Sequence, residues 1–402
     1  PAVYRRGGVR RAIDRPTSNS SMPGPTPRQR RTRRSTQRRV AIVTGTRAEF
    51  GLLTPVLKTL QNSRIIEPKL IVTGMHLLPK FGRTIDEIRA LGFHVDATVR
   101  MQTGRDDATQ EAAAVGKGVH GIANALKRLD CEGVLVLGDR IEAFAGATAA
   151  SLSRRVLFHI HGGDRALGDL DDTLRDAISR LADVHFAATR DAGERLRRMG
   201  EPDNRIHVVG APGLDDIVAM RVARRHAPIT QPSNDRPYAL CIQHPIGRSA
   251  ATEARVCKRI IQAIRRCDLD CVAVYPNSDP GHSGIVDVLK THKGKPGFTV
   301  FKTLPRADFI QLAAGAVVMV GNSSSGVIES ASLGIPAVNV GPRQAGRLRC
   351  GPNVIDVSDT GNAIEAAIRR AIRAKAPRRG RSVYGDGRTG PRIAKLMERL
   401  IM

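Results

Sequence analysis

The side chains best suited to chemistry lie in three short stretches of the first half of the sequence. Gly138-Asp139-Arg140 follows the apolar run 134–137, and the run FHIHGGD at 158–164 supplies His161 and Asp164. A third stretch, GDLDDTLRD at 168–176, adds acids near a predicted helix start. Carboxylates and histidines held together can divide the roles of general base and general acid. We expect such a cluster at one sheet edge, made of Asp139, Asp164, His161 and the pair Asp171 and Asp172.

The same residues also allow structural or metal-binding roles. Asp139 could cap the next helix. His159 and His161 alternate onto one face of a strand, with Asp164 beyond them, so a metal site is conceivable. We favour proton transfer or sugar binding, because no third ligand pattern is visible and the paired glycines suit the close approach of a ligand. The helix dipole alone could explain several of the acids Asp169, Asp171, Asp172 and Asp176.

The run VAIVTGTRAEFG at 40–51 is typical of a strand, a glycine turn and a helix. Apolar residues recur at helical spacing from Phe50, with Pro55 near the predicted helix start. The turn matches neither a dinucleotide fingerprint nor a Walker loop. Arg47 would offer a forked, permanently charged donor to phosphate there. Alternatively, Arg47 and Glu49 form a solvated surface pair.

The run VMVGNSSSGVIESA at 318–331 predicts a second anion site. A strand ends at Gly321 and a helix begins near Val327, so small polar residues lie where a phosphate cradle would form. Glu329 could accept hydrogen bonds from ribose hydroxyls. Other polar residues at strand ends or in nearby loops are His244, Asn277, Arg343 and Arg347. The candidate binding residues of the serine-rich loop are Asn322, Ser323, Ser324, Ser325 and Gly326.

Short apolar runs alternate with helical stretches along most of the chain. This order predicts parallel βαβ units, and hence an α/β fold of two Rossmann-like domains whose strand-end loops face one cleft. We expect a connection between the domains at 222–236. The predicted strands are 40–43, 69–73, 133–138, 155–160, 184–188 and 205–210, then 238–243, 271–275, 298–301, 317–321 and 336–340.

The net charge of the 402 residues is +26, but much of it lies in the first 39, which hold twelve arginines and one acid. This segment lacks apolar periodicity, so we expect a disordered basic tail that resembles a transit peptide or translated upstream sequence. Aromatic residues make up only 3% of the chain, which argues against nucleic-acid binding. No run is long enough for a membrane span. The six scattered cysteines are expected to be mostly buried thiols in a reducing cytoplasm.

Several motifs together resemble one family. The motifs GTRAEFG, TGMH at 73–76, GDR, HIHGGD, GNSSSG and GPRQAGR are similar to those of the hydrolysing UDP-N-acetylglucosamine 2-epimerases of sialic-acid biosynthesis. The resemblance runs from about Val40 to Asp356. It implies the GT-B fold, with domains at 40–221 and 237–378 and a C-terminal helical segment, 379–402, that returns to the first domain. It implies no metal and no nicotinamide cofactor, and suggests a homo-oligomer, either a dimer or a tetramer.

The resemblance also implies a reaction. UDP leaves C1 as the C2 proton is removed, and water then adds to the glycal to give the manno sugar and UDP. Asp139 would transfer the proton at C2, while Asp164 and Asp172 would handle the leaving group and water. Glu329 would take the ribose, and His76 and Arg140 join Glu49 among the substrate-binding candidates. The diphosphate would be held by Arg47, His244, Ser323, Ser324, Ser325 and Gly326.

Two residues depart from the family pattern. Asp164 stands where the family usually has Glu, and Asp176 stands where it often has His after the helix arginine. These departures are consistent with a related donor, such as UDP-N,N'-diacetylbacillosamine, or with slow turnover. Three alternatives stay open: a non-hydrolysing epimerase, a GT-B glycosyltransferase and a non-catalytic sugar-nucleotide sensor. Leu52, Leu53 and Met75 argue against the first, because that class typically carries lysine and glutamine in those regions.

Overall fold

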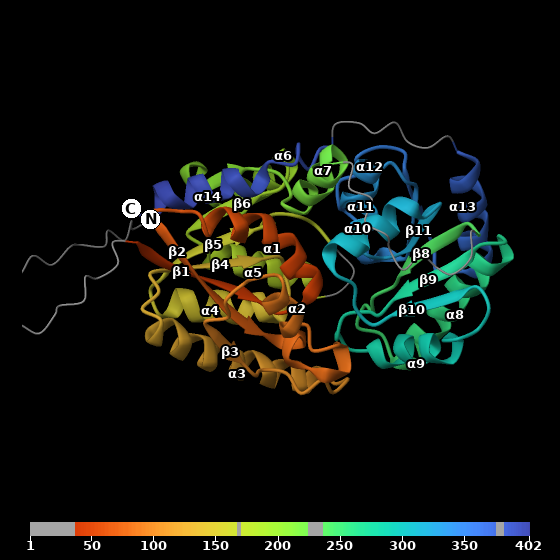
Figure 1. The fold of residues 1–402 in the computed structure, drawn as a ribbon, viewed down its shortest axis with the longest axis horizontal. Helices are drawn as coiled ribbons and strands as arrows, with labels where there is room; N and C mark the ends of the chain where they lie inside the picture. The colour runs from red at the N-terminus through yellow and green to blue at the C-terminus, as the bar shows by residue number, and fades with distance from the viewer. Residues whose placement is uncertain (1–36, 167–169, 224–235, 375–381) are drawn as a thin grey trace, which may run out of the picture. The chain divides into compact units, whose positions relative to one another are not determined.

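Two parallel β-sheets, each covered by helices, present the candidate residues at their carboxyl edges (Figure 1). The computed structural model describes residues 37–166, 170–223, 236–374 and 382–402. Residues 37–402 form one unit. The predicted tail lies outside the described residues up to position 36, as does most of the predicted connection 222–236. The first strand already begins at Arg38, inside the predicted tail.

The first sheet has seven strands in the order β3-β2-β1-β4-β5-β6-β7. All are parallel, and β1 lies between β2 and β4, so the strand order reverses between β1 and β4. Ligands of open α/β sheets bind at such a reversal, beyond the carboxyl ends of the strands. The strands are β1 (Arg38–Thr44), β2 (Ile66–Thr73), β3 (Ala97–Val99), β4 (Gly133–Leu137), β5 (Val156–Ile160), β6 (Val184–Ala187) and β7 (Ile206–Val208).

The second sheet repeats this topology with six parallel strands in the order β10-β9-β8-β11-β12-β13. Its order reverses between β8 and β11, the two strands that precede His244 and Asn322. The predicted architecture of two Rossmann-like parallel sheets is therefore confirmed. The strands are β8 (Tyr238–Ile242), β9 (Asp270–Val274), β10 (Phe298–Phe301), β11 (Val318–Gly321), β12 (Ala337–Val340) and β13 (Val354–Val357).

Helices pack on both faces of each sheet and bury their apolar sides. Those that follow strands of the first sheet are α1 (Arg47–Leu60), α2 (Ile85–Ala90), α3 (Ala108–Arg128), α4 (Ile141–Leu152), α5 (Asp171–Leu181), α6 (Arg190–Arg198) and α7 (Gly213–Ala223). Those of the second half are α8 (Ala250–Arg266), α9 (His282–His292), α10 (Arg306–Gly315), α11 (Ser325–Ile328), α12 (Ser330–Leu333), α13 (Gly361–Arg373) and α14 (Thr389–Leu400). Short 3₁₀ turns cover η1 (Gly74–Leu77), η2 (Pro79–Phe81), η3 (Asp203–Arg205) and η4 (Pro342–Gln344).

Several details differ from the sequence predictions. α1 begins at Arg47, because the Thr46 side chain accepts from the Glu49 N–H, so Pro55 lies inside the helix and not in its first turn. The predicted helix near Val327 is two short helices, α11 and α12. The edge strands β3 and β13 were not predicted, since they are only three and four residues long. No helix in the described ranges is long and apolar enough to cross a membrane.

All six cysteines are free thiols. Cys131, Cys241, Cys257 and Cys271 are buried, while Cys267 and Cys350 are partly exposed. The prediction of mostly buried thiols is therefore confirmed.

The C-terminal helix α14 packs against α1 and α7, as its position beside the first sheet in Figure 1 shows. Asp215, on α7, anchors its start: the carboxylate accepts hydrogen bonds from the N–H groups of Thr389 at 2.9 Å and Gly390 at 2.7 Å. These are free donors of a helix N-terminus, which need acceptors when buried. α14 is thus tied to the first half of the chain, whereas the domain boundaries given above stay a prediction.

Asp215→Ala is expected to lower the free energy of unfolding by about 1–3 kcal/mol, because two buried N–H groups would lose their acceptor. Urea denaturation measures this change. Asp287→Ala is the control, since Asp287 pairs with Lys290 on the surface and its loss should have no measurable effect. Equal stabilities of the two variants would contradict the anchoring role.

Candidate active site

Two adjoining chambers lie between the carboxyl ends of the two sheets. The first chamber is bounded by Arg47, Tyr275, Arg306, Ser325 and Glu329. The second chamber is bounded by Glu49, Asp139, Arg140, His161, Asp171 and Arg175. Both are lined by Thr46, His244, Asn277, Ser323 and Ser324, so the serine loop (322–326) forms part of the boundary between them.

Asp139 enters the second chamber directly after β4. Gly138 makes the turn with φ of +82°, a conformation that suits glycine. The Asp139 carboxylate accepts a hydrogen bond from Arg175, whose side chain is only 2% exposed. Arg175 also donates to the His161 carbonyl oxygen at 3.0 Å. Arg175 therefore fixes the carboxylate and the backbone of His161 in one arrangement.

The two histidines of HIHGGD do not act together. β5 ends at Ile160, and His161 adopts a left-handed conformation with φ of +67°, so the predicted alternation onto one face is wrong. His159 is fully buried, bonds the Gly138 carbonyl at 2.8 Å, and has its pKa lowered to about 3 by burial. His161 lines the second chamber. The described residues contain no group of three metal-ligating side chains.

Asp164 lies behind His161 and does not line either chamber. One of its oxygens contacts His161 Nδ1 at 2.9 Å and accepts from Arg347 Nη1 at 3.0 Å. Burial opposes ionisation of Asp164, but the adjacent His161 and Arg347 outweigh it and lower its pKa. Asp164 is thus placed to orient the His161 ring, and Arg347 lines the chamber beside it.

The acids of α5 diverge because successive helix residues point about 100° apart. Asp171 lines the second chamber and pairs with Arg343 at 2.9 Å. Asp172 instead accepts from the Ala166 N–H at 2.9 Å and pairs with Arg195, so it lines neither chamber. The structure therefore places Asp171, and not the predicted Asp172, beside the ligand space. Asp176 also pairs with Arg195, and Asp169 lies outside the described residues.

This difference has a testable consequence. Asp171→Asn is expected to lower kcat/KM about tenfold or more, since the residue faces the chamber. It should lower the melting temperature less than Asp172→Asn does, because Asp171 has one ion pair, with Arg343, whereas Asp172 has both an ion pair and a backbone hydrogen bond. Asp172→Asn is expected to lower the melting temperature, because it weakens the ion pair with Arg195 and the hydrogen bond from the Ala166 N–H. Parallel steady-state kinetics and thermal melts measure both. The reverse pattern would return the catalytic assignment to Asp172.

The serine loop is held by reciprocal hydrogen bonds between the two central strands. Asn322 accepts from the His244 N–H at 2.7 Å and donates to the His244 carbonyl at 2.8 Å. His244 Nδ1 accepts from the Asn277 N–H at 3.1 Å, and burial lowers the pKa of His244 to about 3. The neutral ring therefore carries its proton on Nε2, where it can donate to a ligand.

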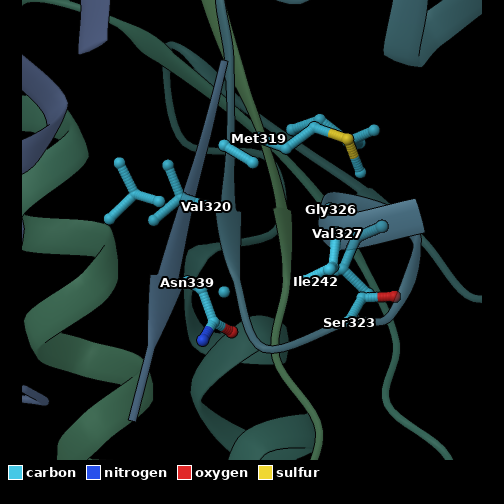
Figure 2. A pocket seen from close by; sticks show the side chains of 11 residues that line it. Ile242, Met319, Val320, Ser323, Gly326, Val327 and Asn339 are labelled. Atoms are coloured by element: carbon cyan, nitrogen blue, oxygen red, sulfur yellow. The ribbon is translucent and has the colours of Figure 1, made fainter. Parts of the chain in front are cut away.

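Ser323, Ser324 and Ser325 all line the first chamber, and the hydroxyls of Ser323 and Ser325 are 2.9 Å apart. Gly326 and Ser323 line a separate small pocket beside β11 (Figure 2). In Figure 2, Met319, Val327 and Ser323 lie on one side of the strands, and Val320 and Asn339 lie on the other. Ser323 therefore borders both this pocket and the two chambers.

The alternative interpretation, a solvated surface pair of Arg47 and Glu49, is wrong. Arg47 pairs with Glu87 at 3.1 Å, and its Nη2 is buried beside the first chamber without a hydrogen-bond partner among the described residues. Burial is the main cause that lowers the Arg47 pKa. Glu49 is 7% exposed and accepts from the Gly45 N–H at 3.1 Å. An unpaired guanidinium nitrogen at a chamber wall is well suited to bind an anion.

His76 was predicted to bind the substrate, but it lines neither chamber. It is fully buried, contacts Thr44 Oγ1 at 3.2 Å and Thr84 Oγ1 at 2.7 Å, and burial lowers its pKa to about 3. Its neighbour Met75 lines the first chamber instead. His76 therefore stabilises the end of β1 through its contact with Thr44.

Two ion pairs at the chambers each contain one predicted residue and one that was not predicted. Arg140 and Glu329 were predicted, whereas their partners Asp279 and Arg306 were not. Arg306, at the start of α10, pairs with Glu329 at 3.0 Å and donates to the Gly213 carbonyl at 2.7 Å. Arg140 pairs with Asp279 at 2.6 Å across the cleft, and the nearby carboxylates outweigh burial and raise its pKa. Arg306 and Asp279 do not belong to a strand-end motif. The one sequence signal that could have identified them as site residues is a charged side chain in a loop or at a helix start.

The chain is similar to known proteins in both sequence and fold. A model of the UDP-N-acetylglucosamine 2-epimerase family matches residues 58–398. The chain is 37% identical to the hydrolysing UDP-N,N'-diacetylbacillosamine 2-epimerase of Legionella pneumophila, over 90% of this chain and 96% of that protein. It is 31% identical to a UDP-N-acetylglucosamine 2-epimerase of Neisseria meningitidis, over 83% and 87%. The fold is similar to that of the Methanocaldococcus jannaschii UDP-GlcNAc 2-epimerase, with a TM-score of 0.76, 19% identity, and coverage of 90% and 99%.

Proposed function

The chain belongs to the UDP-N-acetylglucosamine 2-epimerase family, and on this premise we propose that it is a hydrolysing 2-epimerase of UDP-2-acetamido sugars. The products would be UDP and the free sugar with the manno configuration. The observation that carries the proposal is the Asp139–Arg175–His161 unit in a chamber that adjoins the serine loop. This arrangement sets proton-transfer groups beside a site for a diphosphate leaving group.

The first chamber suits the nucleotide. The free Nη2 of Arg47, the Nε2 proton of His244 and the serine hydroxyls can all donate to phosphate oxygens. Donors fixed before the reaction stabilise negative charge as it develops on the leaving group. Glu329 would accept from a ribose hydroxyl, with Arg306 holding its carboxylate in place. The uracil and ribose would then occupy the first chamber.

The second chamber suits the sugar. Asp139 would remove the C2 proton as the C1–O bond breaks, so that UDP leaves with the bonding electrons and a C1–C2 double bond forms. Water would then add its oxygen to C1, while C2 takes a proton on the opposite face of the ring. We assign that second proton transfer to His161, which Asp164 holds at 2.9 Å. Asp171 would help to orient the attacking water.

The shorter Asp164 fits this scheme. Because its carboxylate is engaged by His161 and Arg347, it acts through the imidazole and not directly on the sugar. Asp164 is therefore a positioning residue. The exact sugar, UDP-N-acetylglucosamine or UDP-N,N'-diacetylbacillosamine, is part of the proposal: the name of the Legionella relative favours the second donor.

The cellular setting also belongs to the proposal. A relative in Escherichia coli, 28% identical over 82% of this chain, is named a polysialic acid biosynthesis protein, which favours a role in the synthesis of sialic or related acids. The free cysteines are typical of a reducing compartment, so we propose a cytoplasmic enzyme. A homo-oligomer is proposed from the family resemblance alone.

The experiment is a donor comparison without an added acceptor. Purified protein is incubated with each of the two UDP-sugars, and UDP and sugar products are quantified by chromatography. Equal amounts of UDP and free manno sugar would support the proposal and identify the donor. Accumulation of the UDP-linked manno sugar would make the protein a non-hydrolysing epimerase. UDP release only after an acceptor is supplied would make it a glycosyltransferase.

A further inference from the structure

Glu49 is a buried carboxyl group at the wall of the second chamber. It is the third residue of α1, and its side chain accepts from the Gly45 N–H while its own N–H bonds the Thr46 hydroxyl. Its other oxygen, Oε1, makes no hydrogen bond within the described residues, although the side chain lines the chamber. One oxygen thus serves the turn, and the other is left for a ligand.

The surroundings of Glu49 disfavour a negative charge. Burial is the largest cause that raises its pKa to about 8, and the nearby Glu142 raises it further, while the Gly45 N–H and Arg140 oppose the rise only in part. Glu142 itself is 1% exposed and lies against Gly45. His76, beneath the same turn, is neutral and contributes no positive charge.

The cations of the second chamber are largely committed to other acids. Arg140 bonds both Glu142 and Asp279, so its charge is shared between two carboxylates. His244, which also lines the chamber, has its pKa lowered to about 3 by burial and is neutral. The other charged and titratable groups that line the chamber or back it are engaged in three sets: Asp139 with Arg175, Asp171 with Arg343, and His161 with Asp164 and Arg347. No cation in the described ranges forms an ion pair with Glu49.

We propose that Glu49 acts as a neutral carboxylic acid that donates a hydrogen bond from Oε1 to an oxygen of the bound UDP-sugar. This inference rests on the proposed function and deepens it. A carboxylate here would repel the diphosphate at the junction of the chambers, whereas the protonated acid adds a donor without adding charge. The same acid still accepts from the Gly45 N–H through its carbonyl oxygen, so the helix start keeps its cap.

The alternative is a purely structural role. A glutamate at this position of a helix commonly bonds back to the turn as an ionised capping-box residue. Such a carboxylate would titrate near or below the ordinary glutamate range. The two roles therefore differ in the pH range in which Glu49 loses its proton.

Thermal melts of the full chain with Glu49→Gln distinguish the two roles without any use of activity. A carboxyl group that stays protonated in the folded protein but ionises in the unfolded chain makes stability fall as pH rises from the unfolded to the folded pKa. Glutamine cannot ionise. The melting temperature of Glu49→Gln minus that of the wild type is therefore expected to increase steadily from pH 5 to pH 8. A constant difference over that range would overturn the proposal.

The pH profile of kcat/KM tests the ligand contact. Wild-type activity should decline above about pH 8 as Glu49 ionises. Glu49→Gln should lose roughly three- to tenfold at pH 7, the scale of one weakened hydrogen bond, and should lack that decline. A loss above about a hundredfold at pH 7, or an unchanged alkaline decline, would contradict the donor role. If the wild type turned over neither UDP-sugar, the proposed function would fail, while the melts would still report the protonation of Glu49.

Discussion

Asp139→Asn is expected to lower kcat about 10³-fold and to leave the affinity for UDP within about threefold of the wild type. The amide keeps the shape of the carboxylate and can still accept from Arg175, but it has no basicity to take the C2 proton. UDP would occupy the first chamber, which Asp139 does not line. The variant should therefore bind its nucleotide normally and fail at the chemical step.

Rapid-quench kinetics and UDP titration calorimetry measure the two quantities separately. Asp287→Asn, a surface change of the same chemical kind, is the control for handling and folding. Retention of more than about a tenth of the wild-type kcat would remove Asp139 from the role of base. A matching loss of UDP affinity would instead show that the substitution disturbs the cleft as a whole.

His161→Gly is expected to lower kcat by about 10²–10³-fold, the usual contribution of a general acid or base. Glycine is the better replacement than alanine, because the backbone at this position is left-handed with φ of +67°. The substitution removes the imidazole and leaves Asp164 and Arg347 paired behind the vacated space.

Added imidazole provides the specific readout. It should restore part of the activity of His161→Gly by filling the space beside Asp164, and it should not affect the wild type. If the rescued rate changes with pH in proportion to the fraction of imidazole that is neutral, or to the fraction that is protonated, His161 has a proton-transfer role. A decrease in kcat of less than about fivefold would exclude that role. So would a larger decrease in a fully folded variant whose activity added imidazole does not raise.

Much of the fold could be predicted from sequence because it depends on local patterns. The buried strands β1, β4, β8 and β11 are short apolar runs, and each ends in glycine or a polar loop. Parallel strands then bring these loops to the same edge of a sheet. Asp139, Arg47 and the serine loop were therefore predicted at the ligand space, where the structure has them. Their chemical roles remain proposals.

The parts that could not be predicted depend on contacts between distant residues. Arg175 lies in the middle of α5, so nothing in its local pattern marks it as the partner of Asp139, 36 residues earlier. Asp279 reaches Arg140 from 139 residues away. Asp171 and Asp172 are adjacent and chemically identical, and only the packing of α5 decides which one faces the chamber.

The buried histidines show a second limit. His76 and His159 have the residue type of a catalytic group, but both are fully buried and serve as hydrogen-bonding supports for strand ends. A local sequence pattern shows that a histidine lies near the end of a strand, but it does not show how deeply the ring is buried. His161 is distinguished from His159 by one left-handed backbone conformation, which is uncommon for any residue other than glycine and which no sequence motif marks here.

The decisive measurement for the hydrolysing mechanism is proton NMR of the wild-type protein with its UDP-sugar in D₂O. Elimination and hydration through a glycal require that C2 lose its original proton and take a solvent deuteron. We expect free UDP together with a free manno sugar that is deuterated at C2. Free UDP with a product that retains the original C2 proton would contradict this mechanism, because the C2 bond would then never have been broken.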